Sequence, residues 1–231
     1  MAQRQSDRAV VLLSGGMDSC VCLAWTRESF AEVHSLFVDY GQRSAENERL
    51  SAERQSLHYE VEFHTANALF LKDWSDSRLF EGDLPRGCSL EGEEATQSAQ
   101  AVWVPGRNGV LVSMAASLAE GIGAGTVVTG LNGEEGRTFR DNTPEFLSAA
   151  DAFCQMSTEN EVRVVAPLIN LDKNGIIRFG MELDAPLGDI WSCYGAGEQM
   201  CGECESCMRL RRALKESGHT PLIGIEFKGK Q

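Results

Sequence analysis

The chain has 231 residues, 42% of them hydrophobic and 24% charged, which is typical of a globular protein with a sizeable core. Lys and Arg total 21 against 34 Asp and Glu, giving a formal net charge of −13. That charge repels polyanions, so the composition argues against nucleic acid or an anionic membrane as a partner. No stretch has the ~20 apolar residues of a membrane-spanning helix, and residues 1–8 are polar, unlike a signal peptide. We expect a soluble, cytoplasmic protein.

Short β-rich runs alternate with helix-like segments along most of the chain. The apolar runs predict strands at 9–13, 33–38, 61–63, 126–129 and 162–165. The segments between them predict helices at 18–27, 44–57 and 108–120, and another after Pro144. This alternation predicts an α/β fold with a doubly wound, mostly parallel sheet of about five strands.

Two segments do not follow this alternation. Residues 66–102 are acidic and interrupted by glycines, and long irregular segments of this kind often cover a functional site, so we expect a lid. From Pro186 onward a cysteine-rich region leads into a basic, helix-like run at 208–215. We therefore divide the chain into an α/β domain at 1–185 and a small C-terminal module at 186–231.

A glycine-containing loop follows the first predicted strand and opens the first predicted helix. Residues 13–19 read Leu-Ser-Gly-Gly-Met-Asp-Ser, and backbone N–H groups at such a turn hold an anion. Ser14 and Ser19 add hydroxyl donors, while Asp18 is placed to meet a metal ion or to cap the helix. The loop lacks the lysine of a Walker A motif, so it is not of the type that transfers a γ-phosphoryl group. An ordinary strand-to-helix turn is the alternative.

Two further turns carry polar side chains. Residues 39–43, Asp-Tyr-Gly-Gln-Arg, close the second predicted strand, and ligands gather at the carboxyl ends of strands in open α/β sheets. Residues 104–108, Val-Pro-Gly-Arg-Asn, precede a predicted helix, and Arg107 can bind a carboxylate or a phosphate through its planar guanidinium. Plain turns explain both patterns about equally well.

The eight cysteines fall into two groups. Four are scattered, at positions 20, 22, 88 and 154, whereas the other four lie close together near the C-terminus: Cys193, Cys201, Cys204 and Cys207. Short spacers between four thiolates favour a tetrahedral structural zinc site without an open position for catalysis. An iron–sulfur cluster uses the same ligands, and unliganded thiols or disulfides are a further alternative.

The string at 14–19 resembles the pyrophosphate loop of the ATP pyrophosphatases. With the motifs that follow it, residues 9–212 resemble the 7-cyano-7-deazaguanine synthase family in order and spacing. These motifs are residues 39–43, residues 104–108, Pro-Glu-Phe at 144–146, Pro-Leu at 167–168, Asp-Lys at 172–173 and Ser-Cys-Tyr at 192–194 with the later cysteines. The resemblance implies an adenine nucleotide alpha hydrolase-like ATP pyrophosphatase domain at 1–185, a zinc ion held by four cysteines, and usually a homodimer.

The resemblance also implies the reaction, in which 7-carboxy-7-deazaguanine and ammonia become 7-cyano-7-deazaguanine at the expense of ATP, on the route to queuosine or archaeosine. We predict that ATP is bound by Leu13, Ser14, Gly15, Gly16, Asp18, Ser19 and Asp39. Asp18 and Asp39 are candidate ligands of Mg²⁺. We predict that the substrate is bound by Tyr40, Gln42, Arg107 and Asn108, and that the catalytic residues are Asp18, Arg107 and Lys173.

One segment departs from the family pattern. Many members have an Asp-Tyr-Ser-Gly-Tyr-Pro-Asp-Cys-Arg-like run before Pro-Glu-Phe, whereas residues 132–143 here read Asn-Gly-Glu-Glu-Gly-Arg-Thr-Phe-Arg-Asp-Asn-Thr. This keeps open a same-fold enzyme that passes the activated carboxylate to another amine, such as a protein. A tRNA-thiolating enzyme is disfavoured by the net charge. A non-enzymatic zinc-ribbon binding protein is supported only by the basic residues Arg209, Arg211, Arg212 and Lys215.

Overall fold

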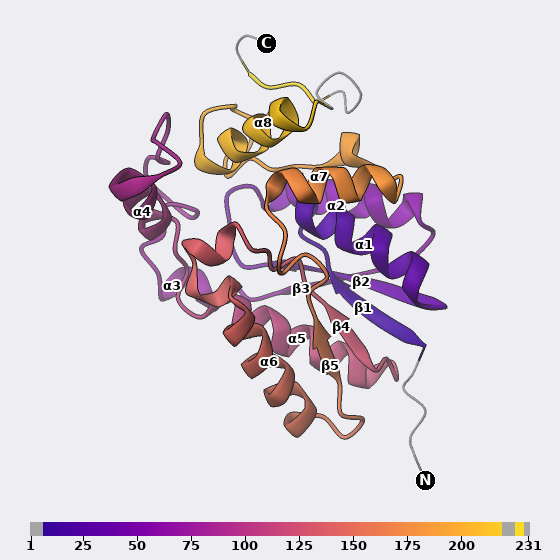
Figure 1. The fold of residues 1–231 in the computed structure, drawn as a ribbon. Helices are drawn as coiled ribbons and strands as arrows, with labels where there is room; N and C mark the ends of the chain where they lie inside the picture. Colours follow the sequence, from indigo (N-terminus) through magenta and orange to yellow (C-terminus); the bar gives the residue numbers. More distant parts are fainter. Residues whose placement is uncertain (1–6, 219–224, 229–231) are drawn as a thin grey trace.

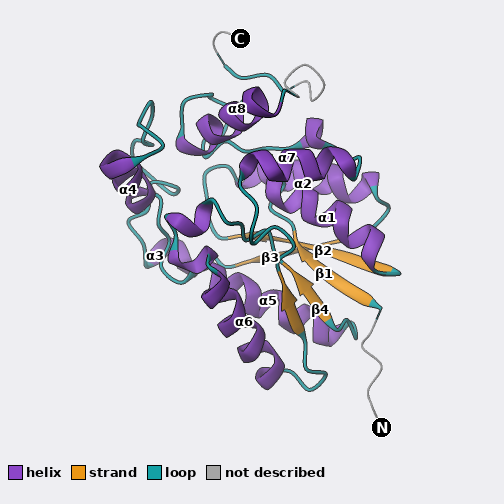
Figure 2. Cartoon of the chain, in the orientation of Figure 1, coloured by secondary structure: helices purple, strands orange, loops and turns teal. Residues whose placement is uncertain are grey.

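The computed structural model describes residues 7–218 and 225–228. Five parallel strands form one sheet with the order β3-β2-β1-β4-β5 (Figures 1 and 2). The strands are β1 (Arg8–Leu12), β2 (Glu32–Asp39), β3 (Glu62–Asn67), β4 (Thr126–Val128) and β5 (Arg163–Val165). The predicted doubly wound parallel sheet is confirmed, and the strand order reverses direction at β1, between β2 and β4.

Helices cover both faces of the sheet, as Figure 1 shows. They are α1 (Met17–Ser29), α2 (Ala45–His58), α3 (Phe70–Asp73), α4 (Gly92–Ala101), α5 (Arg107–Gly121), α6 (Pro144–Ser157), α7 (Lys173–Glu182) and α8 (Glu205–Ser217). Ala9 and Val11 of β1 pack in one apolar cluster with α1 and α7, whereas Val10 packs in a second cluster with α5. Because both faces of β1 are buried, its sequence is a continuous apolar run rather than an alternating one.

Helix α7 was not predicted, because Gly175 and Gly180 lower the helix propensity of its sequence. The helix is instead stabilised by a capping residue at its N-terminus and by its packing against α1. The Asp172 carboxylate caps it by accepting a hydrogen bond of 2.8 Å from the backbone N–H of Gly175. Gly180 lets α7 approach α1 closely, since a Cβ atom there would lie 2.8 Å from Cγ2 of Val21.

The segment predicted as an irregular lid at 66–102 differs from that expectation. Strand β3 extends to Asn67, and α3 and α4 lie within the segment. It also contacts the C-terminal module: the backbone N–H of Gly87 donates to the carbonyl of Glu203 at 3.0 Å, and the Ser98 hydroxyl donates to the Glu205 carboxylate at 3.1 Å. The acidic sequence, interrupted by glycines, predicted neither helix and did not indicate the contact with the C-terminal module.

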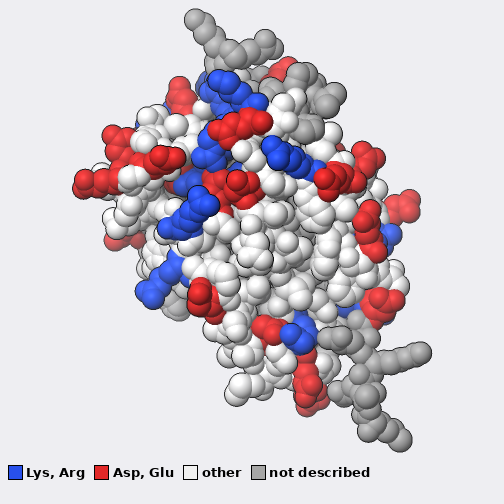
Figure 3. Space-filling view, in the orientation of Figure 1, with Lys and Arg blue, Asp and Glu red and all other residues white. Residues whose placement is uncertain are grey.

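The C-terminal module packs against the sheet domain rather than standing apart from it. Leu210 and Leu214 of α8 are buried in the same apolar cluster as α1 and α7. The predicted basic helix at 208–215 is confirmed within the longer α8. Figure 3 shows Lys and Arg mixed with Asp and Glu near α8, while the middle of that face carries few charges. Among the described residues, no helix is both long and apolar enough to cross a membrane.

Candidate active site and cysteine cluster

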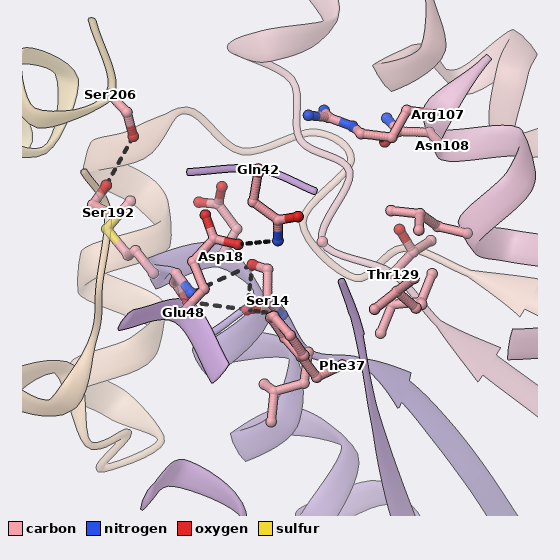
Figure 4. Close-up of a pocket in the computed structure, with 18 of the residues that line it drawn as sticks. Ser14, Asp18, Phe37, Gln42, Glu48, Arg107, Asn108, Thr129, Ser192 and Ser206 are labelled. Atoms are coloured by element: carbon pink, nitrogen blue, oxygen red, sulfur yellow. Dashed lines mark hydrogen bonds between the residues drawn. The ribbon is translucent and has the colours of Figure 1, made fainter. Parts of the chain in front are cut away.

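A cavity opens at the carboxyl ends of β1, β2 and β4, beside the point where the strand order reverses. In open α/β sheets this is the usual place for a ligand. Most of the predicted site residues line it, namely Leu13, Ser14, Gly16, Asp18, Ser19, Tyr40, Gln42, Arg107, Asn108 and Lys173. Figure 4 shows Ser14 on one side of the cavity and Arg107 with Asn108 on the other. The structure therefore brings together side chains from both ends of the chain.

The loop after β1 is held in a fixed conformation by its two serines. The Ser19 hydroxyl accepts a hydrogen bond of 3.2 Å from the backbone N–H of Ser14, and the two hydroxyl oxygens lie 3.1 Å apart. The backbone N–H of Gly16 donates to the Ser14 hydroxyl at 3.3 Å. Helix α1 begins at Met17 without a side-chain cap, so the first backbone N–H groups of α1 are free to bind an anion in the cavity.

Gly15 does not line the cavity, but the loop requires it. Its φ of +78° is in the left-handed region, and a Cβ atom there would collide with the backbone carbonyl of Glu48 on α2. Its carbonyl oxygen accepts hydrogen bonds from Ser51 at 2.9 Å and from Gln55 at 3.0 Å. Gly15 therefore fixes the loop against α2 instead of lining the cavity itself.

Asp18 and Lys173 form an ion pair at the edge of the cavity. The Lys173 ammonium donates to Oδ2 of Asp18 at 2.7 Å and also to Oε1 of Glu135. Asn132 Nδ2 lies 3.4 Å from the same Asp18 oxygen. The other oxygen of Asp18, Oδ1, is buried and has no hydrogen-bond partner among the described residues. It is therefore free to bind a group that enters the cavity.

Burial and the ion pairs have opposite effects on these three groups. Burial raises the pKa of Asp18 to about 6, although the positive charge of Lys173 acts in the other direction. Burial also disfavours the charged forms of Glu135 and Lys173, but their mutual attraction outweighs it, so the pKa of Glu135 is lowered and that of Lys173 is raised. Lys173 is therefore protonated, and Asp18 gains or loses its proton at a pH that can be reached in experiments on the folded protein.

Arg107 is half-buried at the start of α5. Its Nη1 donates a hydrogen bond of 3.3 Å to the hydroxyl of Tyr40, and its guanidinium carbon lies 5.5 Å from the centre of the Tyr40 ring. Asn108 next to it donates to the backbone carbonyl of Asp141 at 3.1 Å. The guanidinium is therefore held in place on one side while its remaining donors are free for an anionic ligand.

Gln42 and Asp39 have different surroundings, although both belong to the predicted 39–43 motif. Gln42 lines the cavity and donates a hydrogen bond of 2.8 Å to Glu48, a carboxyl group whose pKa is raised by burial. Asp39 accepts from the backbone N–H of Gly41 at 2.8 Å and lines a separate hollow beside Arg49 and Asn67. The structure does not bring Asp39 to Asp18, because the two carboxylates line different hollows.

The segment that departs from the family pattern, 132–143, contains site residues that the sequence analysis did not single out. Asn132 and Glu135 contact Asp18 and Lys173, as described above. The buried carboxylate of Glu134 accepts hydrogen bonds from Arg209 at 2.8 Å and from Arg212 at 2.7 Å, both on α8. The signal was present, because the segment follows β4 just as the 39–43 motif follows β2.

The four clustered cysteines come together as predicted. Their sulfur atoms all lie within 4.8 Å of one another, and those of Cys201 and Cys207 are 4.0 Å apart. Backbone N–H groups donate to the sulfurs of Cys193 and Cys201 at 3.2 to 3.4 Å, which stabilises thiolates. Sulfurs about 2.3 Å from a single tetrahedral ion would be about 3.8 Å apart, so the spacing suits one metal ion.

Comparison with known proteins finds similarity along nearly the whole chain. The sequence model of a family described as "Queuosine biosynthesis protein QueC" matches residues 8–218. The chain is 43% identical over 216 residues to the 7-cyano-7-deazaguanine synthase of Pelotomaculum thermopropionicum, covering 91% of this chain and 98% of that protein. It is 42% identical over 222 residues to the enzyme of the same name from Pyrococcus horikoshii, covering 90% and 93%.

The similarity to solved structures is more distant. The NH3-dependent NAD synthetase from Campylobacter jejuni aligns over 99% of this chain and 92% of that chain, with 14% identity and a TM-score of 0.48. The sequence comparisons are the ones that decide the family, because one family model covers nearly all of the described residues. The chain belongs to the queuosine biosynthesis protein QueC family.

Proposed function

We propose that this chain converts 7-carboxy-7-deazaguanine and ammonia to 7-cyano-7-deazaguanine, with cleavage of ATP to AMP and pyrophosphate. The observation that carries the proposal is that, in a chain of this family, the anion-binding loop and Arg107 line the same cavity. Family membership favours this reaction over transfer to another amine, tRNA thiolation or a non-enzymatic binding role. The departure at 132–143 does not conflict with it, because Asn132 and Glu135 pair with residues of the proposed ATP site.

The chemistry requires activation of a carboxylate, because its leaving group would otherwise be oxide. Transfer of AMP to a carboxylate oxygen releases pyrophosphate and makes AMP the leaving group, so that ammonia adds to the carbon and the amide forms. A second transfer of AMP to the amide oxygen, followed by loss of AMP and protons, gives the nitrile. For both steps the active site must hold the triphosphate of ATP beside the base, and it must stabilise the negative charge of the phosphate groups.

Three groups of the chain have roles in this proposal. The loop at 14–19 and the N-terminus of α1 bind phosphate oxygens. Arg107 binds the substrate carboxylate through its free guanidinium donors, with Tyr40, Gln42 and Asn108 around it. Lys173 has three N–H donors and uses two of them on Asp18 and Glu135, so the third is available to a phosphate or carboxylate oxygen.

The cavity also suits a magnesium ion. Oδ1 of Asp18 is a buried carboxylate oxygen without a hydrogen-bond partner in the described chain, and carboxylate oxygens are the ligands that Mg²⁺ prefers. Such an ion would neutralise charge on the phosphates when bound. Asp18 holds it in this proposal, and Lys173 keeps that carboxylate oriented through Oδ2.

The cysteine cluster has a structural role in this proposal. Cys193, Cys201, Cys204 and Cys207 hold one zinc ion, and the spacing of their sulfurs favours zinc over an iron–sulfur cluster, whose cysteines bind different iron atoms. With four thiolates there is no open position for a substrate. A homodimer and a cytoplasmic location, which the family resemblance implies, stay predictions, and light scattering tests the first.

The test is incubation of the purified chain with 7-carboxy-7-deazaguanine, Mg-ATP and ammonium, with the base followed by mass spectrometry. We expect the amide to appear transiently and the nitrile to accumulate, with neither product formed when ammonium is omitted. Accumulation of the amide without nitrile would favour transfer to a different amine. An unchanged base with no AMP formed would contradict the proposal altogether.

A further inference from the structure

A group of metal-binding side chains lies at the amino ends of β2 and β3, away from the cavity and from the cysteine cluster. His34 of β2 is directly opposite Glu62 of β3 in the parallel register, and His64 follows two positions later. Residues two apart in a strand share a face of the sheet, so all three side chains lie on one face. The residues of β2 that line the cavity are Leu36, Phe37 and Val38, and none of the three cluster residues lines it, so this cluster is separate from the proposed active site.

The three side chains already have the spacing of a ligand set. Nδ1 of His34 lies 3.1 Å from Nε2 of His64 and 3.6 Å from Oε2 of Glu62, and Nε2 of His64 lies 3.7 Å from Oε1 of Glu62. Ligands at about 2.1 Å from one ion are separated by about 3.0 to 3.4 Å in octahedral or tetrahedral geometry. The three residues each offer one ligand atom within 4.8 Å of the others, so reorientation of Glu62, whose side chain is 67% exposed, brings the three atoms around one ion.

A second carboxylate orients the more buried imidazole. Oε1 of Glu32 lies 3.0 Å from Nε2 of His34, and its other oxygen pairs with Arg8 at 2.6 Å. A hydrogen bond donated by Nε2 of His34 to this carboxylate leaves the lone pair of Nδ1 facing His64 and Glu62, the arrangement in which histidines commonly bind metals.

From this geometry we propose that His34, His64 and Glu62 bind a divalent transition metal ion, with water completing its coordination. Two imidazoles and one carboxylate favour ions such as zinc, nickel or cobalt over magnesium or calcium. The ion would join the edge strand β3 to β2 and stabilise that side of the sheet. The competing explanation is that His64 donates a hydrogen bond to His34 with no ion between them. The proposal does not depend on the proposed enzymatic function.

Nickel titration of the zinc-loaded chain, purified without a polyhistidine tag, tests this site. Calorimetry should show one Ni²⁺ bound per chain while the zinc content stays constant, and bound nickel should raise Tm. His64→Gln keeps a polar side chain at the strand edge but removes a ligand. We expect it to weaken binding by more than about 100-fold and to abolish the rise in Tm, while Glu32→Gln weakens binding about 10-fold as the loss of an outer partner.

Two further variants make the result decisive. His58, on α2, lies outside the cluster, so His58→Gln is the matched control and should bind nickel like the wild type. Glu62→Gln changes an exposed side chain and keeps the fold, so weaker binding there reports the loss of a ligand. The proposal is overturned if the wild type binds no nickel, if His58→Gln binds as weakly as His64→Gln, or if Glu62→Gln binds unchanged.

Discussion

Lys173 donates a hydrogen bond of 2.7 Å to Asp18, although 155 positions separate them in the sequence. Lys173 is the first residue of α7 and Asp18 is in the first turn of α1, so the contact brings two helix N-termini to one side of the cavity. Each charge compensates the other in a site that is otherwise costly for ions. The protonation of Asp18 therefore depends on Lys173, which can be measured.

The first prediction concerns pH. Burial raises the pKa of Asp18 to about 6, and the proposed metal ligand is the ionised form, so kcat/KM should fall as pH decreases below about 6. Because Lys173 lowers this pKa, Lys173→Met should shift the acidic limb to higher pH. Lys72→Met, which removes an exposed lysine, is the control. NMR titration of the Asp18 carboxyl gives the same pKa without turnover, and an unchanged or lower pKa in Lys173→Met would contradict the account.

The second prediction concerns the cysteine cluster. We expect one zinc per chain, and Cys204→Ser should lose it and be poorly soluble, because structural zinc contributes on the order of 10 kcal/mol to folding in small modules. Cys88→Ser removes a cysteine outside the cluster and should keep both zinc and Tm. Metal analysis by mass spectrometry and thermal unfolding measure the two quantities. A zinc-free wild type, or a Cys204→Ser variant that unfolds like the wild type, would rule out a metal site.

The sequence predicted the features of the fold that depend on local pattern. The apolar runs predicted all five strands, and the string at 14–19 predicted a loop that lines the cavity. Helix α7 was missed because its stability comes from packing of Gly180 against Val21 rather than from propensity. Glu135 was not predicted as a site residue, because its ion pair with Lys173 joins two segments that are distant in the sequence. Local pattern therefore predicts the elements and the motifs, whereas long-range ion pairs need the tertiary structure.

The third prediction concerns the link between α8 and the segment at 132–143. Glu134 accepts hydrogen bonds from Arg209 and Arg212 and from the backbone N–H of Lys173 at 3.2 Å, so it connects the C-terminal helix to the Lys173 turn. Glu134→Gln removes the carboxylate that the two arginines share, while Arg209 keeps its pair with Glu205, and removal of one partner of a buried pair costs up to about 3 to 5 kcal/mol. We expect a loss of that size in the free energy of unfolding by urea, together with a lower kcat.

Glu216→Gln is the matched control for that experiment. It removes a half-exposed carboxylate that lies 3.9 Å from Arg212, and exposed pairs contribute less than about 1 kcal/mol. The variant should therefore unfold almost like the wild type and keep its kcat. Equal losses of stability in the two variants would show that Glu134 does not connect the two regions in the way proposed.

The fourth prediction concerns the bond of ATP that is broken. The loop at 14–19 lacks a Walker lysine and lies beside the proposed base site, so cleavage should occur between the α and β phosphates. AMP and pyrophosphate should form together and in proportion to the base consumed. Chromatography of the nucleotides measures this directly. The finding of ADP and orthophosphate without AMP would mean that the loop has been assigned to the wrong chemistry.

The last prediction concerns a single ATP site for both activations. Each step transfers AMP to an oxygen on the same exocyclic carbon, so movement of the base to a second site between the steps would gain nothing. Asp18→Ala should therefore abolish turnover of both the acid and the separately supplied amide. Asp39→Ala is the matched control, because Asp39 lines a different hollow, and it should retain both activities.

The two substrates make this test decisive. If one site serves both steps, Asp18→Ala must lose its activity toward the acid and its activity toward the amide together. With the wild-type enzyme, the acid and the amide must each inhibit conversion of the other competitively. An Asp18→Ala variant that still dehydrates the amide at the wild-type rate would show two sites. Loss of both activities in Asp39→Ala would instead indicate that Asp39, at the end of β2, is the carboxylate that binds the metal ion. The buried Oδ1 of Asp18 would then not be the metal ligand that the phosphates require.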